Sequence, residues 1–130
     1  MDDVMALHQE IFDMALDLQT YKEGLILKRV GGKLVGYVLF QAVDDFADLH
    51  YIVVAPAFRR LGYGYELMNT FLEHIALAGV KTVTLEVRSD NVVATRLYEA
   101  FEFECMHVRK KYYKDGCDGL LMKLKLDENA

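Results

Sequence analysis

Hydrophobic residues near the start of the chain recur at helical spacing and form one apolar stripe. The residues of this stripe are Val4, Leu7, Ile11, Met14 and Leu18. A single stripe of this period is typical of a helix that packs one face against a core. Asp3 precedes the stripe, and its side chain can cap a helix. The pattern therefore predicts an N-terminal helix that Asp3 caps and that extends towards Leu18.

The next hydrophobic runs are shorter and are separated by turn residues, which is typical of strands. The predicted strands are residues 25–27, 33–40, 47–54, 81–87, 103–113 and 120–126. Gly31-Gly32 lies between the first two strands and favours a hairpin turn. Asp44-Asp45 marks the next turn, and the polar Lys114-Asp115-Gly116 joins the last two strands.

Two later segments again have helical periodicity. The first covers about 63–78, and Gly79 is placed to end it. Its expected inner face consists of Leu67, Phe71, Leu72 and Ile75. The second begins near Asp90-Asn91, either of which can cap a helix, and continues to about Phe101. This order of elements predicts a mixed α/β (α+β) fold with an antiparallel front.

Composition narrows the class of protein. The chain has 130 residues, of which 53% are hydrophobic and 27% are charged, so we expect one globular domain over residues 1–130. A net charge of −5 argues against non-specific binding to nucleic acid and suits a basic substrate. No apolar run approaches the ~20 residues of a membrane span, and no signal peptide is visible.

The two cysteines indicate a reducing compartment. Cys105 and Cys117 have no histidine neighbours at zinc-ligand spacing, so the sequence predicts no metal site and two free thiols. Free thiols are typical of cytoplasmic proteins, and we expect a cytoplasmic location.

A basic, glycine-containing loop lies between the third predicted strand and the second predicted helix. Its residues are Arg59, Arg60, Leu61, Gly62, Tyr63 and Gly64. The first N–H groups of a helix have no internal partner, and the helix dipole adds positive potential there. Glycines let the backbone approach a ligand, and arginines add charge. The loop therefore predicts a phosphorylated ligand, with a solvated basic turn as the simpler alternative.

Two other phosphate-binding motifs fit the loop less well. A mononucleotide P-loop needs Gly-x-x-x-x-Gly-Lys-Ser/Thr, which the chain lacks. A dinucleotide fingerprint would use Gly62 and Gly64, with Glu86 as the acidic residue, but Leu67 replaces its third glycine. The loop also begins too far beyond the strand for that fingerprint, which stays the weaker alternative.

The loop and the segments after it resemble one protein family. The loop matches the Arg/Gln-x-x-Gly-x-Gly/Ala signature of the GNAT family of N-acetyltransferases. The segment Leu-Glu-Val-Arg-Ser-Asp-Asn at 85–91, then Leu-Tyr-Glu at 97–99 and Arg-Lys-Lys-Tyr-Tyr at 109–113, are similar to later blocks of this family. They are most similar to its ribosomal-protein alanine N-acetyltransferase (RimI-like) branch. The resemblance implies a mostly antiparallel central sheet with helices on both faces.

The resemblance also implies the substrates. The donor would be acetyl-CoA, whose pyrophosphate the loop would bind. The acceptor would be a primary amine, with a protein N-terminus favoured, attacked directly in a ternary complex. A small-molecule amine or polyamine acetyltransferase and a non-catalytic CoA-binding regulatory module remain alternatives. The tyrosines of 109–113 would line the acceptor groove.

Two residues carry the implied chemistry. An α-amine has a pKa near ~8, so it must lose a proton before attack, and a carboxylate can accept that proton. Glu86 matches the base of the branch, and partial burial in an otherwise apolar strand would strengthen it as a base. Tyr98 matches the family's acid, which would protonate the departing thiolate. From the residues alone, the favoured interpretations are a solvent-facing strand residue for Glu86 and a core residue for Tyr98.

The remaining implied contacts concern the donor. They involve Ile52, Val53, Val54, Arg59, Arg60, Leu61, Gly62, Tyr63, Gly64, Tyr65 and Asn91. Backbone groups of 52–54 would pair with the pantetheine arm and polarise the thioester carbonyl, which requires neighbouring strands that splay apart. Asn91 would contact the donor in addition to capping a helix.

The chain departs from the family pattern at three places. Glu102-Phe103 stands where the branch has Gly-Phe, so we expect a different helix exit, because Glu in a left-handed conformation costs roughly 1 kcal/mol. The chain begins with a helical pattern, so we expect the family's first strand to be missing, which would leave a sheet edge that a second copy could cover. The branch's tryptophan near the acceptor is also absent. These changes fall mainly on the acceptor side, and they leave a monomer and a homodimer equally open.

Overall fold

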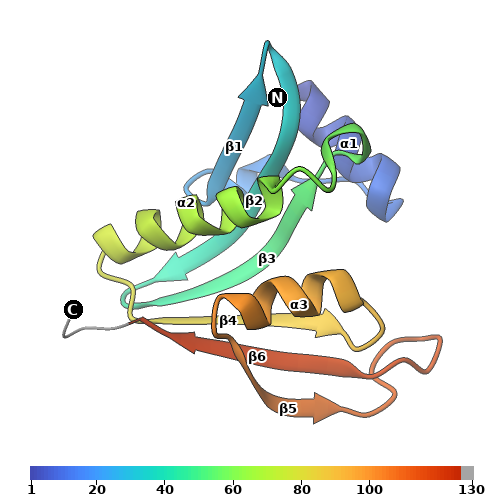
Figure 1. Cartoon of the computed structure of the whole chain (residues 1–130), viewed down its shortest axis with the longest axis vertical. Helices are drawn as coiled ribbons and strands as arrows, with labels where there is room; N and C mark the ends of the chain where they lie inside the picture. The colour runs from blue at the N-terminus through green and yellow to red at the C-terminus, as the bar shows by residue number, and fades with distance from the viewer. Residues whose placement is uncertain (127–130) are drawn as a thin grey trace.

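The computed structural model describes residues 1–126, so the last four residues of the expected 1–130 domain lie outside it. Figure 1 shows the order of the elements along the chain. The helices are α1 (Asp2–Phe12), α2 (Tyr63–Leu77) and α3 (Val92–Ala100), with short 3-10 helices η1 (Leu18–Tyr21) and η2 (Pro56–Phe58). The strands are β1 (Leu25–Val30), β2 (Lys33–Val43), β3 (Phe46–Val54), β4 (Thr82–Arg88), β5 (Glu104–Arg109) and β6 (Gly119–Lys125).

The strands form one six-stranded sheet in the order β1-β2-β3-β4-β6-β5. Only β3 and β4 are parallel, which confirms the predicted mixed and mostly antiparallel sheet. Gly31 and Gly32 form the predicted hairpin turn with φ of 58° and 78°, values that glycine adopts at little cost.

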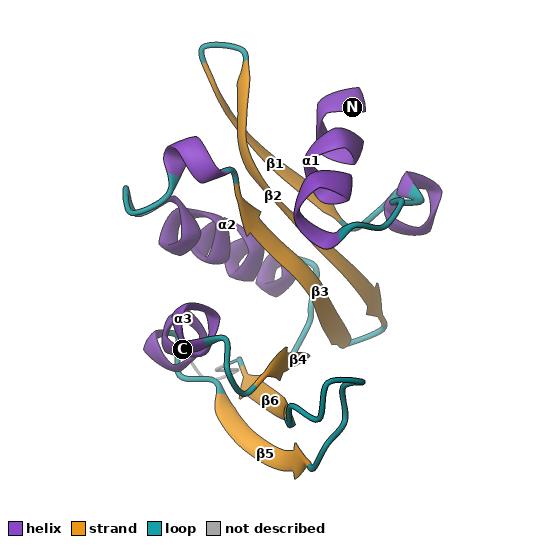
Figure 2. Cartoon of the chain, turned by 90° about the vertical axis from the view of Figure 1, so that its right-hand side faces the viewer, coloured by secondary structure: helices purple, strands orange, loops and turns teal. Residues whose placement is uncertain are grey.

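Helices cover both faces of the sheet, as expected (Figure 2). On one face, α2 and α3 enclose the main core, which includes Leu67, Phe71, Leu85, Tyr98 and Met122. On the other face, α1 and η1 pack over β1–β3 around Val4, Tyr21, Tyr37, Leu39 and Val53. Within residues 1–126, no helix has the length and apolar character needed to span a bilayer.

The first helix is shorter than predicted. It ends at Phe12, because Asp13 adopts a left-handed conformation with φ of 52°. Met14 and Leu18 therefore lie beyond the helix, and Leu18 begins η1. The prediction that Asp3 caps the helix is also wrong, since Asp3 lies in the first turn and its carboxylate binds Arg29. The arginine fixes the start of α1 on the hairpin.

The exits of α2 and α3 have the same geometry despite different residues. After α2, the N–H of Val80 donates to the carbonyl of Ile75, and Gly79 has φ of 89°. After α3, Phe103 donates in the same way to Tyr98, and Glu102 has φ of 71°. Both are Schellman motifs. The expectation of a different exit at Glu102 is therefore wrong: the packing of Phe103 in the core retains the turn, and Glu102 bears the strain.

The strands β3 and β4 pair over three residues only and then diverge. The pairs are Phe46 with Thr82, Ala47 with Val83 and Asp48 with Thr84. Immediately beyond the last pair, a bulge at His50 interrupts the pairing of β3 with β2. A bulge bends its strand, which directs β3 away from β4. Figure 1 shows the two strands meeting at one end and separating towards the other, where α2 begins.

Candidate active site

Beyond Asp48 and Thr84 the strands β3 and β4 are no longer paired, and the interval between their facing edges is here named the slot. Ile52, Val53 and Val54 pair with β2 on one side and have no strand partner on the β4 side within residues 1–126. The N–H of Ala55 donates to the carbonyl of Val35 over 2.7 Å, which keeps the end of β3 attached to β2. The predicted splay is therefore present, and the edge of β3 along residues 52–54 that faces away from β2 is open to an extended ligand.

The basic loop lies at the mouth of this slot. Gly62 is the N-cap of α2 with φ of 87°, and no side chain caps the helix. The backbone N–H groups of residues 60–65 have no hydrogen-bond acceptor within the described chain. Arg60 has a left-handed φ of 64°, which is costly for a residue with a side chain. Free N–H groups, a helix N-terminus and local strain together are typical of an anion-binding loop.

Arg59 has a role that the sequence did not predict. Its Nε donates to the carbonyl oxygen of Val54 over 3.1 Å. This bond joins the loop to the end of β3 and so fixes the loop relative to the slot. The Arg60 side chain makes no recorded interaction with residues 1–126, which leaves it available to a phosphate.

The other predicted loop residues differ in exposure. Leu61 and Tyr65 are exposed, and the Tyr65 ring lies 5.6 Å from that of Phe101. Tyr63 is half-buried, with its ring 6.1 Å from that of Phe58. A Cβ added at Gly64 would lie 3.7 Å from Leu97, which is ordinary contact, whereas nothing lies within 4 Å of a Cβ at Gly62. Gly62 is therefore needed for its φ rather than for space.

Tyr98 is on α3 and packs in the core on the face of the sheet that α2 and α3 cover. Its ring is 8% exposed and packs against Phe103 in the main core. No side chain among residues 1–126 hydrogen-bonds its hydroxyl. The hydroxyl keeps some contact with solvent, because no polar side-chain atom in these residues is both fully buried and without a partner. Burial raises the pKa of the phenol to about 12. At neutral pH it is therefore a protonated donor with a free hydroxyl, the state required of a general acid.

Glu86 lies on the opposite face of the sheet. It points away from the core, whereas its neighbours Leu85 and Val87 point into it. Glu86 is exposed as a whole residue, but its side chain is only 31% exposed, so the carboxylate-bearing side chain is partly buried, as expected. Its Oε1 lies 3.2 Å from a guanidinium nitrogen of Arg109 on β5. The base candidate and the acid candidate thus lie on opposite faces of the sheet.

A charged network holds the loop after β5 beside Glu86. Arg88 bonds Asp90 at 3.0 Å and Asp115 at 2.6 Å, and these hydrogen bonds lower the pKa of both carboxyls. The Arg88 guanidinium also lies 4.9 Å from the ring centroid of Tyr113. Tyr113, one of the tyrosines predicted to line the acceptor groove, therefore contacts the end of β4, the strand that carries Glu86.

Asn91 performs the predicted capping role. Its Oδ1 accepts a hydrogen bond from the N–H of Ala94 over 3.1 Å at the start of α3. Its expected contact with the donor stays a prediction.

The sequence did not identify two polar pairs under α1 and η1. His8 is 1% exposed, its Nδ1 lies 2.9 Å from the Tyr37 hydroxyl, and burial lowers the pKa of the imidazole. His50 Nδ1 and the Tyr21 hydroxyl are hydrogen-bonded at 2.7 Å. The position of His8 one turn after Val4 indicated burial, but nothing in the sequence linked either histidine to a tyrosine.

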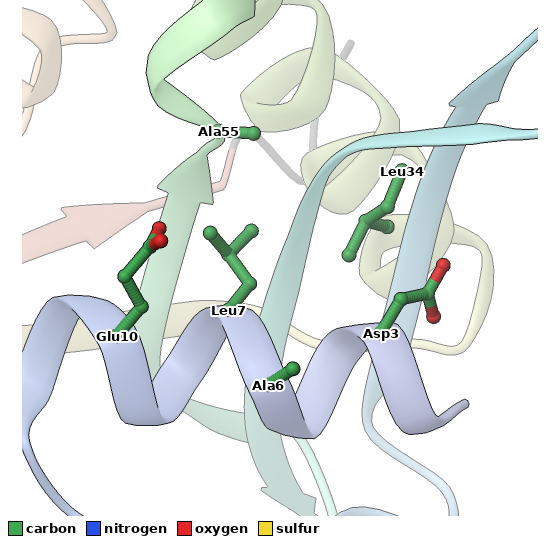
Figure 3. Close-up of a pocket in the computed structure, with 6 residues that line it drawn as sticks. All are labelled: Asp3, Ala6, Leu7, Glu10, Leu34 and Ala55. Atoms are coloured by element: carbon green, nitrogen blue, oxygen red, sulfur yellow. The ribbon is translucent and has the colours of Figure 1, made fainter.

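A hollow of about 270 Å³ lies between α1 and the ends of β2 and β3 (Figure 3). Its lining residues are Asp3, Ala6, Leu7, Glu10, Leu34 and Ala55. Leu7 and Glu10 point from α1 towards Ala55, which directly follows the slot residues. The hollow therefore adjoins the mouth of the slot on the α1 face.

Comparison with known proteins agrees with this architecture. The model of the acetyltransferase (GNAT) family matches residues 3–103. A [ribosomal protein bS18]-alanine N-acetyltransferase of Haemophilus ducreyi is 29% identical over 112 residues, which cover 78% of this chain and 77% of that protein. The enzyme of the same name from Escherichia coli K12 is 36% identical over 98 residues, which cover 73% of this chain but only 66% of the relative.

A solved structure has the same fold. The crystal structure of the ribosomal-protein-S18-alanine N-acetyltransferase from Escherichia coli superposes with a TM-score of 0.81 at 29% identity. The superposition covers 97% of this chain and 89% of that one. The family model matches most of the chain, and the fold agrees with it, so the chain belongs to the acetyltransferase (GNAT) family.

Proposed function

We propose that this protein transfers the acetyl group of acetyl-CoA to the α-amine of a protein N-terminus. The observation that carries the proposal is the divergence of β3 and β4, with a basic loop of free N–H groups at the open end and ionisable side chains on both faces of the sheet. Family membership makes the protein an acetyl-CoA-dependent N-acetyltransferase. The residue roles below extend that assignment.

The donor side supplies binding and orientation. The N–H groups of residues 60–65 bind the pyrophosphate, and the Arg60 side chain adds charge. The unpaired backbone of Ile52, Val53 and Val54 pairs with the pantetheine arm as an added strand would. One N–H of this stretch donates to the thioester carbonyl and stabilises the oxyanion that forms on attack.

The acceptor side supplies the base. The amine arrives on the face that carries Glu86, where the carboxylate accepts its proton directly or through one water. Arg109 holds this carboxylate in place from β5. The amine nitrogen then forms a bond to the carbonyl carbon, and the carbon–sulfur bond breaks.

Tyr98 completes the reaction from the opposite face. Its phenol donates a proton to the departing thiolate, so that free CoA leaves as the thiol. Burial raises the pKa of this phenol, so it holds its proton at neutral pH and can donate to the departing sulfur. The ammonium loses two protons on its way to the neutral amide, and Glu86 passes both in turn to solvent. Tyr98 gives one proton to the thiolate and regains one from solvent, so each turnover releases one proton.

The choice of acceptor rests on the relatives. Two bacterial relatives are named for alanine acetylation on ribosomal protein bS18. The acidic chain, with a net charge of −5, suits a basic partner such as a ribosomal protein. We therefore infer an N-terminal alanine on a basic protein as the preferred acceptor.

Intact-mass spectrometry of peptides tests the proposal. One peptide begins with alanine and follows the bS18 N-terminus, and a matched peptide has a blocked α-amine but an internal lysine. We expect one added acetyl group on the first peptide and none on the second. Acetylation of the blocked peptide, or of polyamines alone, would instead support a lysine or small-molecule acetyltransferase. Binding of acetyl-CoA without acetylation of any amine would support a CoA-binding module.

A further inference from the structure

The point at which β3 and β4 separate is held by side chains as well as by backbone. Asp48 and Thr84 form the last pair of the two strands. The Thr84 hydroxyl donates to Oδ1 of Asp48 over 2.5 Å across this pair. Because the bond joins the strands at their final contact, it fixes where the slot closes.

A second contact holds the bulge that follows. His50 is the extra residue in β3, and its Nδ1 is hydrogen-bonded to the Tyr21 hydroxyl of η1 at 2.7 Å. Its Nε2 lies 3.7 Å from Oδ2 of Asp48. Thr84, Asp48, His50 and Tyr21 thus form a continuous chain from β4 through β3 to η1, here named the vertex clamp.

The vertex clamp lies at the reactive end of the slot, an argument that rests on the proposed function. In the proposed function the donor's phosphates bind at the mouth, and its pantetheine arm runs along residues 52–54 towards the end at which β3 and β4 meet in Figure 1. The acyl group is the far end of the donor and therefore points at the vertex. On the helix face, Leu49 and Leu85 fill the core beside the vertex and are 4% and 2% exposed.

We propose that the vertex clamp sets the acyl-chain length that the enzyme accepts. A longer acyl group needs the strands to separate one step further, at Asp48 and Thr84. The clamp resists this separation, and close-packed leucines leave no space on the helix face. One extra methylene in a fitted site typically changes selectivity by about 10–200-fold. Asp48 and Thr84 are then positioning residues, because they act through the strands and not on the reacting atoms.

Calorimetric titration with acetyl-CoA and propionyl-CoA tests this role without any acceptor. Thr84→Val keeps the shape of the side chain but removes the donor, and Thr84→Ser keeps the donor. We expect wild-type protein to bind acetyl-CoA at least about tenfold more tightly than propionyl-CoA. Thr84→Val should reduce this ratio about fivefold or more, and Thr84→Ser should preserve it. Asp48→Ala, which removes the acceptor of the bond, should reproduce the effect of Thr84→Val.

Thr82→Val is the matched control. Thr82 lies on the same strand and the same face, two residues before Thr84, and its side chain makes no recorded hydrogen bond within residues 1–126. The ratio of the affinities of Thr82→Val for acetyl-CoA and propionyl-CoA should equal that of wild type. An unchanged ratio in both Thr84→Val and Asp48→Ala, or an equal change in Thr82→Val, would overturn the inference. Failure of wild-type protein to bind any acyl-CoA would overturn the proposed donor site itself, which is a distinguishable result.

Discussion

The donor side and the acceptor side of this protein are built from different parts of the chain. The donor side consists largely of backbone: unpaired groups of β3, free N–H groups of the loop and the N-terminus of α2. The proposed acceptor side consists of side chains on an exposed surface. Every residue of β5 is exposed, and the Glu86 carboxylate is held by its ion pair with Arg109 of that strand. Backbone geometry tolerates few substitutions, whereas exposed side chains vary freely. The acetyl donor can therefore be identified from the sequence, whereas the identity of the acceptor amine cannot.

The largest expected effect concerns the base. Glu86→Gln removes the proton acceptor, so we expect kcat to fall about 10³-fold while KM for acetyl-CoA stays the same. Steady-state kinetics with the alanine peptide measure both constants. Glu104→Gln is the control, because Glu104 is an exposed glutamate on β5 with no recorded ion pair in the described chain. Equal losses in the two variants would indicate a general charge effect.

The acid should have the next largest effect. Tyr98→Phe removes the hydroxyl but keeps the buried ring, so we expect kcat to fall about 10²-fold at neutral pH. The thermal midpoint should change little, since no side chain bonds this hydroxyl among residues 1–126. If Tyr98→Phe retains full kcat, Tyr98 is a core residue only.

The raised pKa of Tyr98 also predicts an alkaline limit to stability. The phenol is neutral in both folded and unfolded states below pH 10, so its contribution to stability is complete there. That contribution is lost as the pH rises from 10, the ordinary pKa, towards the folded value of about 12. Denaturant unfolding over this range should show wild type losing about 2 kcal/mol more than Tyr98→Phe. Parallel curves for the two proteins would contradict the shift.

Two glycines with the same backbone conformation, one in the basic loop and one outside it, distinguish a binding role from a purely conformational role. Gly62 and Gly79 have nearly equal φ, 87° and 89°, and a Cβ at either meets open space. Replacing either with alanine should cost about 1 kcal/mol of stability. Only Gly62→Ala should also raise KM for acetyl-CoA, by about tenfold, because it alone shapes the phosphate loop. A similar rise in Gly79→Ala would contradict the assignment of the loop.

The smallest effect concerns the exit of α3. Glu102→Gly relieves the left-handed strain, so we expect the free energy of unfolding to increase by about 1 kcal/mol. Neither kcat nor KM should change, since Glu102 lies outside both sides of the site. Denaturant unfolding together with kinetics checks the two parts, and a loss of stability would show that the Glu102 side chain makes a favourable contact.

Much of the fold could be predicted from the sequence because local rules decided it. Gly31-Gly32 and Asp44-Asp45 gave the turns, and alternating residues gave β4. The length of α1 could not be predicted, because the left-handed turn at Asp13 depends on local backbone geometry rather than on hydrophobic spacing. The exit at Glu102 was missed because tertiary packing of Phe103 outweighed the conformational preference of glutamate.

The candidate site also contains some features that the sequence predicted and others that it did not. The loop, the slot residues and the Asn91 cap lie where their motif placed them. The ion pair of Glu86 with Arg109 and the bond from Arg59 to Val54 both depend on which segments become neighbours, which spacing along the chain does not encode.

The most direct measurement is intact-mass detection of acetyl transfer to the alanine peptide by wild-type protein and by the double variant Glu86→Gln, Tyr98→Phe. Both proteins should bind CoA equally in a parallel titration, because the donor side is untouched. We predict one added acetyl group with wild type and no transfer above the uncatalysed level with the double variant. Full acetylation by the double variant would contradict the account of how this site acts.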